Sequence, residues 1–121
     1  MSGPKIRAAF VTDLQHRPYA SDDGHHTHYR IVLSLEGAPE GTQSVTYKLH
    51  ETYADALREV GQGPSFQVEI TSYGDFAIKA LVRTANDFEI LTSSLIDALR
   101  GSYGANPDPE IASAIDVLAT P

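Results

Sequence analysis

The feature that most constrains the fold is a repeated alternation of apolar and polar residues. In residues 29–35 every second side chain is large and apolar, and Arg30 and Ser34 lie between them. The same period of two occurs in four other short stretches: residues 6–11, 45–49, 66–70 and 76–83. Short, alternating strands predict an all-β fold, an immunoglobulin-like antiparallel β-sandwich of two sheets. They argue against a parallel α/β sheet, whose strands read as continuous apolar runs.

Turn residues separate these stretches. Residues 15–28 contain Pro18 and a Ser-Asp-Asp-Gly cluster at positions 21–24, so we expect a loop there. Residues 37–41 contain two glycines and Pro39 and predict a turn. Residues 54–64 predict a further loop.

The spacing of apolar residues changes towards the C-terminus. Helical spacing connects Phe88, Leu91, Leu95, Ile96 and Leu99. Ser94 and Asp97 resemble a capping pair, and Gly101 is a plausible helix stop.

A second helical signal follows this one. Asp108 and Pro109 read as an N-cap and the first residue of a helix, whose apolar stripe is Ile111, Ile115 and Leu118. We therefore predict one or two short helices within residues 92–119. Their stripes would cover one end or edge of the sandwich or, alternatively, a neighbouring domain or a second subunit. The predicted organisation is one domain, residues 1–121, with a sandwich over 1–85 and a helical tail over 86–121.

Composition excludes several classes of protein. The chain has 121 residues, the length of one domain, and contains no cysteine, which rules out disulfides and thiolate chemistry. Its formal net charge of −7 disfavours nucleic acid as a partner and suits a basic protein segment. No signal peptide or membrane-spanning run is visible, so we expect a cytoplasmic protein that makes no membrane contact.

Two polar corners mark a candidate binding site. A predicted strand ends at His50 and leads into Glu51-Thr52-Tyr53, and another leads into Ser72-Tyr73-Gly74-Asp75. If the strands pair as neighbours, both corners lie at one end of the sandwich. Two exposed rings at loop tips, beside a hydroxyl group and an imidazole, are typical of a recognition site.

The same residues carry a family resemblance. Leu49-His50-Glu51-Thr52-Tyr53, then Arg58 and Val60, then Tyr73-Gly74-Asp75-Phe76 occur in the order that marks the YEATS domain. The upstream run 28–33 is similar to the family's first long strand. The resemblance covers roughly residues 5–85. Its departures, such as tyrosine at 53 and 73 and serine at 72, point to the prokaryotic branch.

The resemblance implies a reader of acylated lysine. Tyr53 and Tyr73 would flank a flat acyl group, and the Thr52 hydroxyl would bond the acyl amide. The Tyr73 backbone N–H would bind the acyl oxygen, and Gly74 would let the chain turn closely around the ligand. The candidate ligand-binding residues are His26, His50, Thr52, Tyr53, Ser72, Tyr73, Gly74 and Asp75.

Other interpretations stay open at this stage. The two tyrosines can simply pack on the sandwich rim, and the domain can serve as a structural or protein-interaction module of a larger prokaryotic signalling or conflict system. Copies of the chain can also associate through the tail into a homo-oligomer.

Metal and catalytic chemistry have weaker support. The cluster of His16, His25, His26 and His28 lies in a predicted loop without helical ligand spacing, so we predict no metal site. No nucleophile, P-loop or dinucleotide motif is present, and we predict neither catalysis nor a cofactor.

Overall fold

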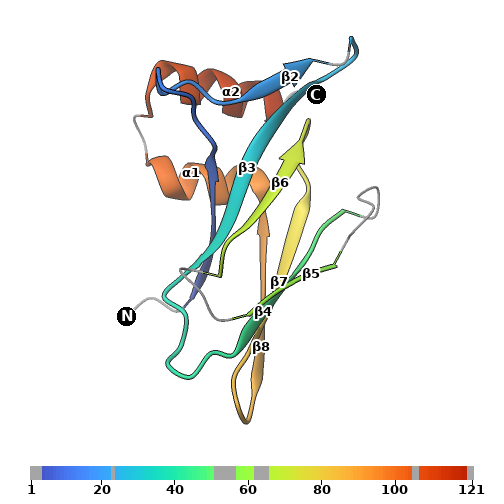
Figure 1. The fold of residues 1–121 in the computed structure, drawn as a ribbon, viewed down its shortest axis with the longest axis vertical. Coiled ribbons are helices and arrows are strands. Elements are labelled where there is room, and N and C mark those ends of the chain that lie inside the picture. The colour runs from blue at the N-terminus through green and yellow to red at the C-terminus, as the bar shows by residue number, and fades with distance from the viewer. Residues whose placement is uncertain (1–3, 23, 51–56, 62–65, 105–106, 120–121) are drawn as a thin grey trace.

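The computed structural model describes residues 4–22, 24–50, 57–61, 66–104 and 107–119. Two antiparallel sheets pack face to face, and two helices lie at one end (Figure 1). The strands are β1 (Lys5–Phe10), β2 (Ala20–Asp22), β3 (Thr27–Glu36), β4 (Ser44–Lys48), β5 (Leu57–Val60), β6 (Val68–Ser72), β7 (Ala77–Arg83) and β8 (Phe88–Ser94), and the helices are α1 (Leu95–Tyr103) and α2 (Pro109–Ala119).

Each sheet is built around one central strand or pair of strands. In the first sheet β3 pairs with β1, β2 and β6. The second sheet has the order β5-β4-β7-β8. All of these pairs are antiparallel, and this confirms the predicted two-sheet sandwich with short C-terminal helices. No helix of the described residues is long and apolar enough to cross a membrane.

The alternating pattern identifies the inner faces correctly. The four residues of β3 that were predicted to share the inner face are all buried: Tyr29, Ile31, Leu33 and Leu35. In β4 the inner residues Val45 and Tyr47 are buried, while Lys48 is exposed. These side chains form one core between the sheets, as predicted from their period of two.

Three strands lie where the sequence predicts something else. β2 and β5 fall inside the predicted loops 15–28 and 54–64. β8 occupies residues 88–94, where the helical spacing from Phe88 to Leu91 was a wrong indication. β8 is an edge strand, and its residues Phe88 and Ile90 are both exposed. The spacing of these apolar residues therefore does not indicate which face of the segment is buried. Pairing with β7 along its whole length decides its conformation instead.

The limits of the two helices follow from their caps. Ser94 is the N-cap of α1, and its hydroxyl accepts from the Asp97 backbone N–H at 3.0 Å, as predicted. The predicted stop at Gly101 is wrong, because α1 continues to Tyr103 and ends at Gly104. Gly104 has φ 77°, a conformation that favours glycine at a helix C-terminus. The predicted start of α2 is confirmed, since the Asp108 carboxylate accepts from the Glu110 backbone N–H at 3.1 Å.

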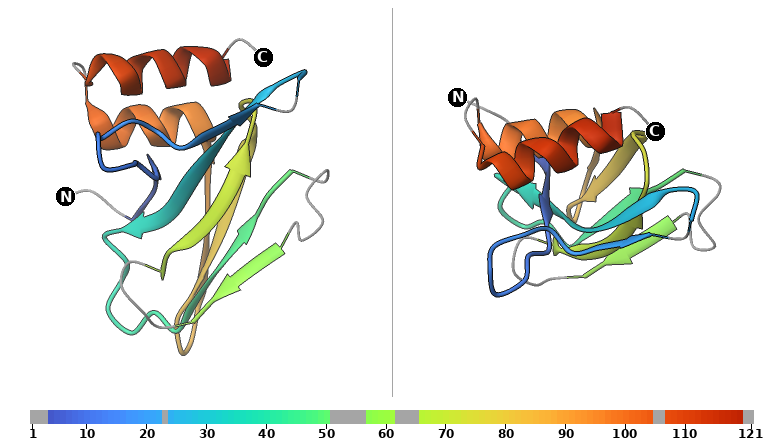
Figure 2. Two further views of the ribbon diagram at one scale, coloured as in Figure 1. Left: turned by 45° about the horizontal axis from the view of Figure 1, so that its top comes forward. Right: turned by 90° about the horizontal axis from the view of Figure 1, so that it is seen from above.

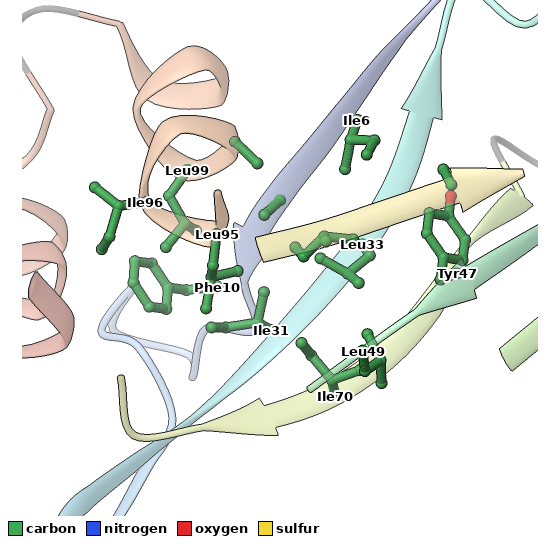
Figure 3. Close-up of a cluster of buried hydrophobic side chains, with 14 of the residues drawn as sticks. Ile6, Phe10, Ile31, Leu33, Tyr47, Leu49, Ile70, Leu95, Ile96 and Leu99 are labelled. Atoms are coloured by element: carbon green, nitrogen blue, oxygen red, sulfur yellow. The ribbon is translucent and has the colours of Figure 1, made fainter. Parts of the chain in front are cut away.

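The helices lie at one end of the sandwich, where α1 packs beside β1 and α2 packs on α1 (Figure 2). Leu95, Ile96 and Leu99 point into the core next to Phe10 and Ile31 (Figure 3). The backbone N–H of Phe10 donates to the Tyr103 hydroxyl at 2.9 Å, which ties the end of β1 to the end of α1. The apolar stripe of α1 therefore completes the core, and this matches the expected cover for one end of the sandwich.

A buried tyrosine joins β4 to the segment before β6. The side chain of Tyr47 is fully buried, and its hydroxyl donates to the Phe66 carbonyl at 2.9 Å. Phe66 itself has φ 49°, in the left-handed region, so this hydrogen bond holds a backbone position that an aromatic residue rarely adopts. Burial raises the pKa of Tyr47 well above its ordinary value.

We predict that Tyr47→Phe lowers the free energy of unfolding by about 1–2 kcal/mol at pH 7, because the Phe66 carbonyl loses its buried donor. The loss should shrink above about pH 10. There the unfolded Tyr47 ionises while the folded one stays protonated, so the wild-type chain loses a contribution to stability that the phenylalanine variant never had. Burial also raises the pKa of Tyr29 and Tyr103, but these residues act equally in both chains and cancel in the difference. Urea titrations at both pH values measure the two differences. Equal differences would contradict this account.

Candidate functional site: the corner between β6 and β7

Three strand ends meet at one end of the sandwich. Antiparallel pairing of Tyr29 with Ser72 brings the start of β3 to the end of β6. Pairing of Lys48 with Lys79 brings the end of β4 beside the first half of β7, which follows directly from β6. The topology therefore places Leu49 and His50, residues 24–26 and the corner 73–76 at the same end of the sandwich (Figure 1).

The Ser72 side chain shapes the corner from inside. It is buried, and its hydroxyl donates to the Gly74 carbonyl at 2.7 Å. The Gly74 backbone N–H in turn lies 3.3 Å from the same hydroxyl oxygen. Both hydrogen bonds stay within the turn, so in this structure the Ser72 hydroxyl binds the backbone of the corner itself. Gly74 is half-buried and does not have a positive φ.

Asp75 connects the corner to the start of α1. Its carboxylate accepts from the Ile96 backbone N–H at 3.0 Å, and the neighbouring Phe76 carbonyl accepts from Leu95 N–H at 2.9 Å. With Ser94 bonded to Asp97, the first three N–H groups of the helix all have partners. A carboxylate at a helix N-terminus also interacts favourably with the helix dipole. The corner is thus anchored on the helix that completes the core.

We predict that Asp75→Ala lowers the free energy of unfolding by about 1 kcal/mol, the usual cost of losing a side-chain cap. It should also shift the backbone amide resonances of Tyr73 and Gly74, because the corner loses its attachment. Ser94→Ala is the matched control, since it removes a cap of the same helix that does not belong to the corner. Equal shifts at Tyr73 in both variants would contradict a specific role for Asp75.

Tyr73 forms the exposed tip of the corner and contacts two imidazoles. Its side chain is 43% exposed. The His26 ring stacks on the Tyr73 ring with centroids 4.4 Å apart and an angle of 20° between the planes. His28 approaches the same ring edge-on at 5.2 Å and 62°. The structure therefore joins the segment before β3 to the β6–β7 corner in one aromatic cluster.

The predicted site residues are placed as follows. His26, Ser72, Tyr73, Gly74 and Asp75 lie together at the corner, as the preceding contacts show. His50 is exposed just beyond the end of β4. Thr52 and Tyr53 lie outside the described residues, so their predicted part in the site stays a prediction.

His28 was not among the predicted binding residues, although it contacts Tyr73. Its place two residues after His26 was the available signal, since residues two apart share a face of a strand. Among the residues that the structure describes, no three histidine, aspartate or glutamate side chains are arranged to hold a metal ion. What the cluster offers is flat π surfaces and imidazole hydrogen-bonding groups.

The fold and this corner define a class: a small immunoglobulin-like sandwich with an aromatic loop tip at one end. The family model of the prokaryotic YEATS domain matches residues 29–94, more than half of the 121 residues. The chain belongs to the prokaryotic YEATS family, as its motifs predicted.

Solved structures of Yaf9, the yeast AF-9 homologue, have a similar fold. The Yaf9 YEATS domain recognising a succinylated histone H3 peptide is 18% identical, with a TM-score of 0.55 over 94% of this chain and 91% of that chain. The same domain bound to an acetylated histone H3 lysine is 20% identical, with a TM-score of 0.51 over 76% and 72%. A search among curated proteins finds no match to this chain.

Proposed function

We propose that this domain is a non-catalytic binding module that recognises an acylated lysine, or a similarly flat acyl ligand, at the Tyr73 corner. The observation that carries the proposal is the half-exposed Tyr73 ring, which stacks on His26 at the tip of an anchored turn. Yaf9 YEATS domains of similar fold bind acetylated and succinylated histone peptides. In this chain the source of the acylated lysine need not be a histone.

The chemistry of the corner suits such a ligand. An acylated lysine ends in a flat, neutral amide that can stack on an aromatic face, whereas free lysine brings a strongly hydrated charge. The ring of Tyr73 supplies one wall, and Tyr53 is our proposed second wall. Thr52 and the Tyr73 backbone N–H are the proposed partners of the acyl amide, which must keep hydrogen bonds once it leaves water.

Anchoring of the turn favours binding as well as stability. Ser72 and Asp75 hold the backbone of the corner through hydrogen bonds to Gly74 and to α1. A wall that is already ordered loses little conformational entropy when a ligand arrives. We therefore propose that Ser72 and Asp75 support the site, that His26 and His50 flank it, and that Gly74 lets the chain pass close to the ligand.

An NMR titration of the labelled domain tests the proposal. The ligands are an acetyl-lysine peptide, a crotonyl-lysine peptide and the same peptide with unmodified lysine. We expect acyl-dependent shifts at Thr52, Tyr53, Tyr73 and Gly74, with affinity as weak as the high-micromolar range, about −5 to −6 kcal/mol. Identical responses to acylated and unmodified peptides, or none at millimolar peptide, would refute acyl-lysine recognition.

A second candidate is a protein-interaction module of a larger prokaryotic system. It is favoured by the exposed apolar residues Phe88 and Ile90 on β8, an edge strand. We also propose that residues 1–121 form one folding unit, because residues of both helices belong to the same buried cluster as the strands. The formal charge of −7 supports a protein partner over nucleic acid and is consistent with a cytoplasmic domain.

A further inference from the structure

β8 forms one edge of the second sheet, and its apolar residues face outwards. Phe88 is 61% exposed and Ile90 is 59% exposed. In the β7–β8 ladder they lie opposite Arg83 and Leu81, which belong to the outer face because the alternate residue Val82 is buried. Leu81 and Ile90 thus form a short apolar row that runs up to the free edge of the sheet.

The hydrogen bonds at the two ends of this ladder show which backbone groups of β8 face outwards. Thr84 N–H donates to the Asp87 carbonyl and Leu95 N–H to the Phe76 carbonyl, both at 2.9 Å. Because hydrogen-bonded pairs alternate in an antiparallel ladder, the odd-numbered residues of β8 bond to β7. The N–H and C=O groups of Phe88, Ile90 and Thr92 therefore point to the free edge of the sheet.

Natural edge strands are usually protected by lysine, proline or a bulge. β8 has the sequence FEILTSS and carries Glu89 as its single charge. The β7–β8 hairpin projects from the sandwich at the end away from the helices (Figure 1). β8 thus combines outward-facing backbone groups, an apolar row and little charge, which are the features of a strand that pairs with another strand.

We propose that β8 pairs with β8 of a second copy of this chain, antiparallel, around a two-fold axis at Ile90. In this register Ile90 faces the partner's Ile90, and Phe88 faces the partner's Thr92. Ile90 and Thr92 present both of their backbone groups to the edge, so the central pair can exchange two hydrogen bonds. The Phe88 N–H donates to the Asp87 carboxylate at 2.8 Å, and in the dimer it would exchange that acceptor for the carbonyl of the partner's Thr92. The two apolar rows then join into one across the axis, Leu81–Ile90 from each copy.

The charge of Glu89 favours this register over the one that is shifted by one pair towards the hairpin. A hollow of about 250 Å³ lies between the start of β1 and β8, and it is lined by Pro4, Lys5, Ile6, Arg7, residues 91–93 and Asp97. Arg7 is paired with Glu36, so Lys5 is the cation of this hollow that can meet a carboxylate of a second copy. In the proposed register Glu89 lies opposite the partner's Leu91, at the hollow that contains the partner's Lys5. Shifting the register by one pair towards the hairpin would instead place Glu89 opposite the partner's Glu89, where like charges repel.

The interface is small, because a single strand from each copy forms it. It belongs to the class of weak, transient contacts. We therefore expect the dimeric fraction of the protein to increase as the concentration rises from micromolar to millimolar. The two copies together double the formal charge of −7 per chain, which opposes association at low salt. Added salt should therefore strengthen the dimer.

Single-cysteine crosslinking tests the register directly, because the chain contains no native cysteine. Paired hydrogen-bonded residues have Cα atoms about 5.5 Å apart, which suits a disulfide. We expect Ile90→Cys to form a disulfide dimer under mild oxidation. Phe88→Cys should not form a disulfide dimer. Residue 88 lies opposite the partner's Thr92, four residues along the strand from the partner's Phe88, so the two cysteines would be separated by about 13 Å. Leu57→Cys is the control, equally accessible at 64% exposure but on the opposite edge strand.

Sedimentation velocity of the uncrosslinked chain supplies the second measurement. Ile90→Lys should weaken the dimer roughly tenfold or more by placing two like charges on the axis, and Leu57→Lys should leave it unchanged. Circular dichroism checks that both variants stay folded. A chain that stays monomeric to millimolar concentration, a dimer that survives Ile90→Lys, or crosslinking at Phe88→Cys or Leu57→Cys as fast as at Ile90→Cys would each overturn the proposal.

Discussion

Replacing Leu99 with alanine should lower the free energy of unfolding by about 3–4 kcal/mol, the range found for a leucine truncated in a well-packed core. The Leu99 side chain is fully buried. It points from α1 towards Phe10 and the sandwich core (Figure 3). A cavity left by the truncation would be lined by core side chains of both β1 and α1. For a domain of ordinary stability this loss is a large fraction of the total.

Urea titrations of the variant and the wild-type chain measure the change. Val117→Ala on α2 is the control, because this side chain is 39% exposed and its truncation should cost less than about 0.5 kcal/mol. If Leu99→Ala cost no more than Val117→Ala, the helices would be an appendage of the sandwich and not a part of its core. The assignment of residues 1–121 to one folding unit would then be wrong.

The sequence predicts the central strands of both sheets well. In β3 and β7 one face is buried in the core and the other is not, so the period of two is strong. The three strands that the sequence does not predict all lie at sheet edges or are very short. β2 has three residues, all exposed, and β5 is the outer strand of its sheet. Pairing with a neighbour fixes their conformation, and this is a tertiary effect that local periodicity does not report.

The candidate site, like the fold, is predicted only in part by the sequence. The motif predicts the corner at 72–75, and the strand pairing then brings His26 to Tyr73. The attachment of Asp75 to Ile96 joins residues 21 positions apart. Nothing in the local sequence of the corner reports this bond, because it depends on how α1 packs against the sandwich. An acidic residue in a corner motif can therefore be a helix cap as well as part of a recognition loop.

Tyr73→Ala should weaken binding of an acetyl- or crotonyl-lysine peptide by about tenfold or more, which corresponds to about 1.4 kcal/mol. The variant loses the exposed half of the ring as a stacking surface, worth about 0.5–1.5 kcal/mol, together with the apolar area that the ligand would cover. Tyr73→Phe should retain most of the affinity, since the aromatic face remains. Tyr53→Ala should have an effect of similar size if that residue forms the second wall.

Isothermal titration calorimetry or the NMR titration gives the dissociation constants, and thermal unfolding shows whether the variants stay folded. Phe88→Ala is the control, because Phe88 is an exposed aromatic residue on the β7–β8 hairpin, at the other end of the sandwich (Figure 1). It should leave the affinity unchanged. Equal affinities for the wild-type chain and the Tyr73→Ala variant would place the binding site elsewhere. If neither chain bound acylated peptide, the corner would be a structural turn, and the exposed edge at β8 would become the principal candidate surface for contacts with other proteins.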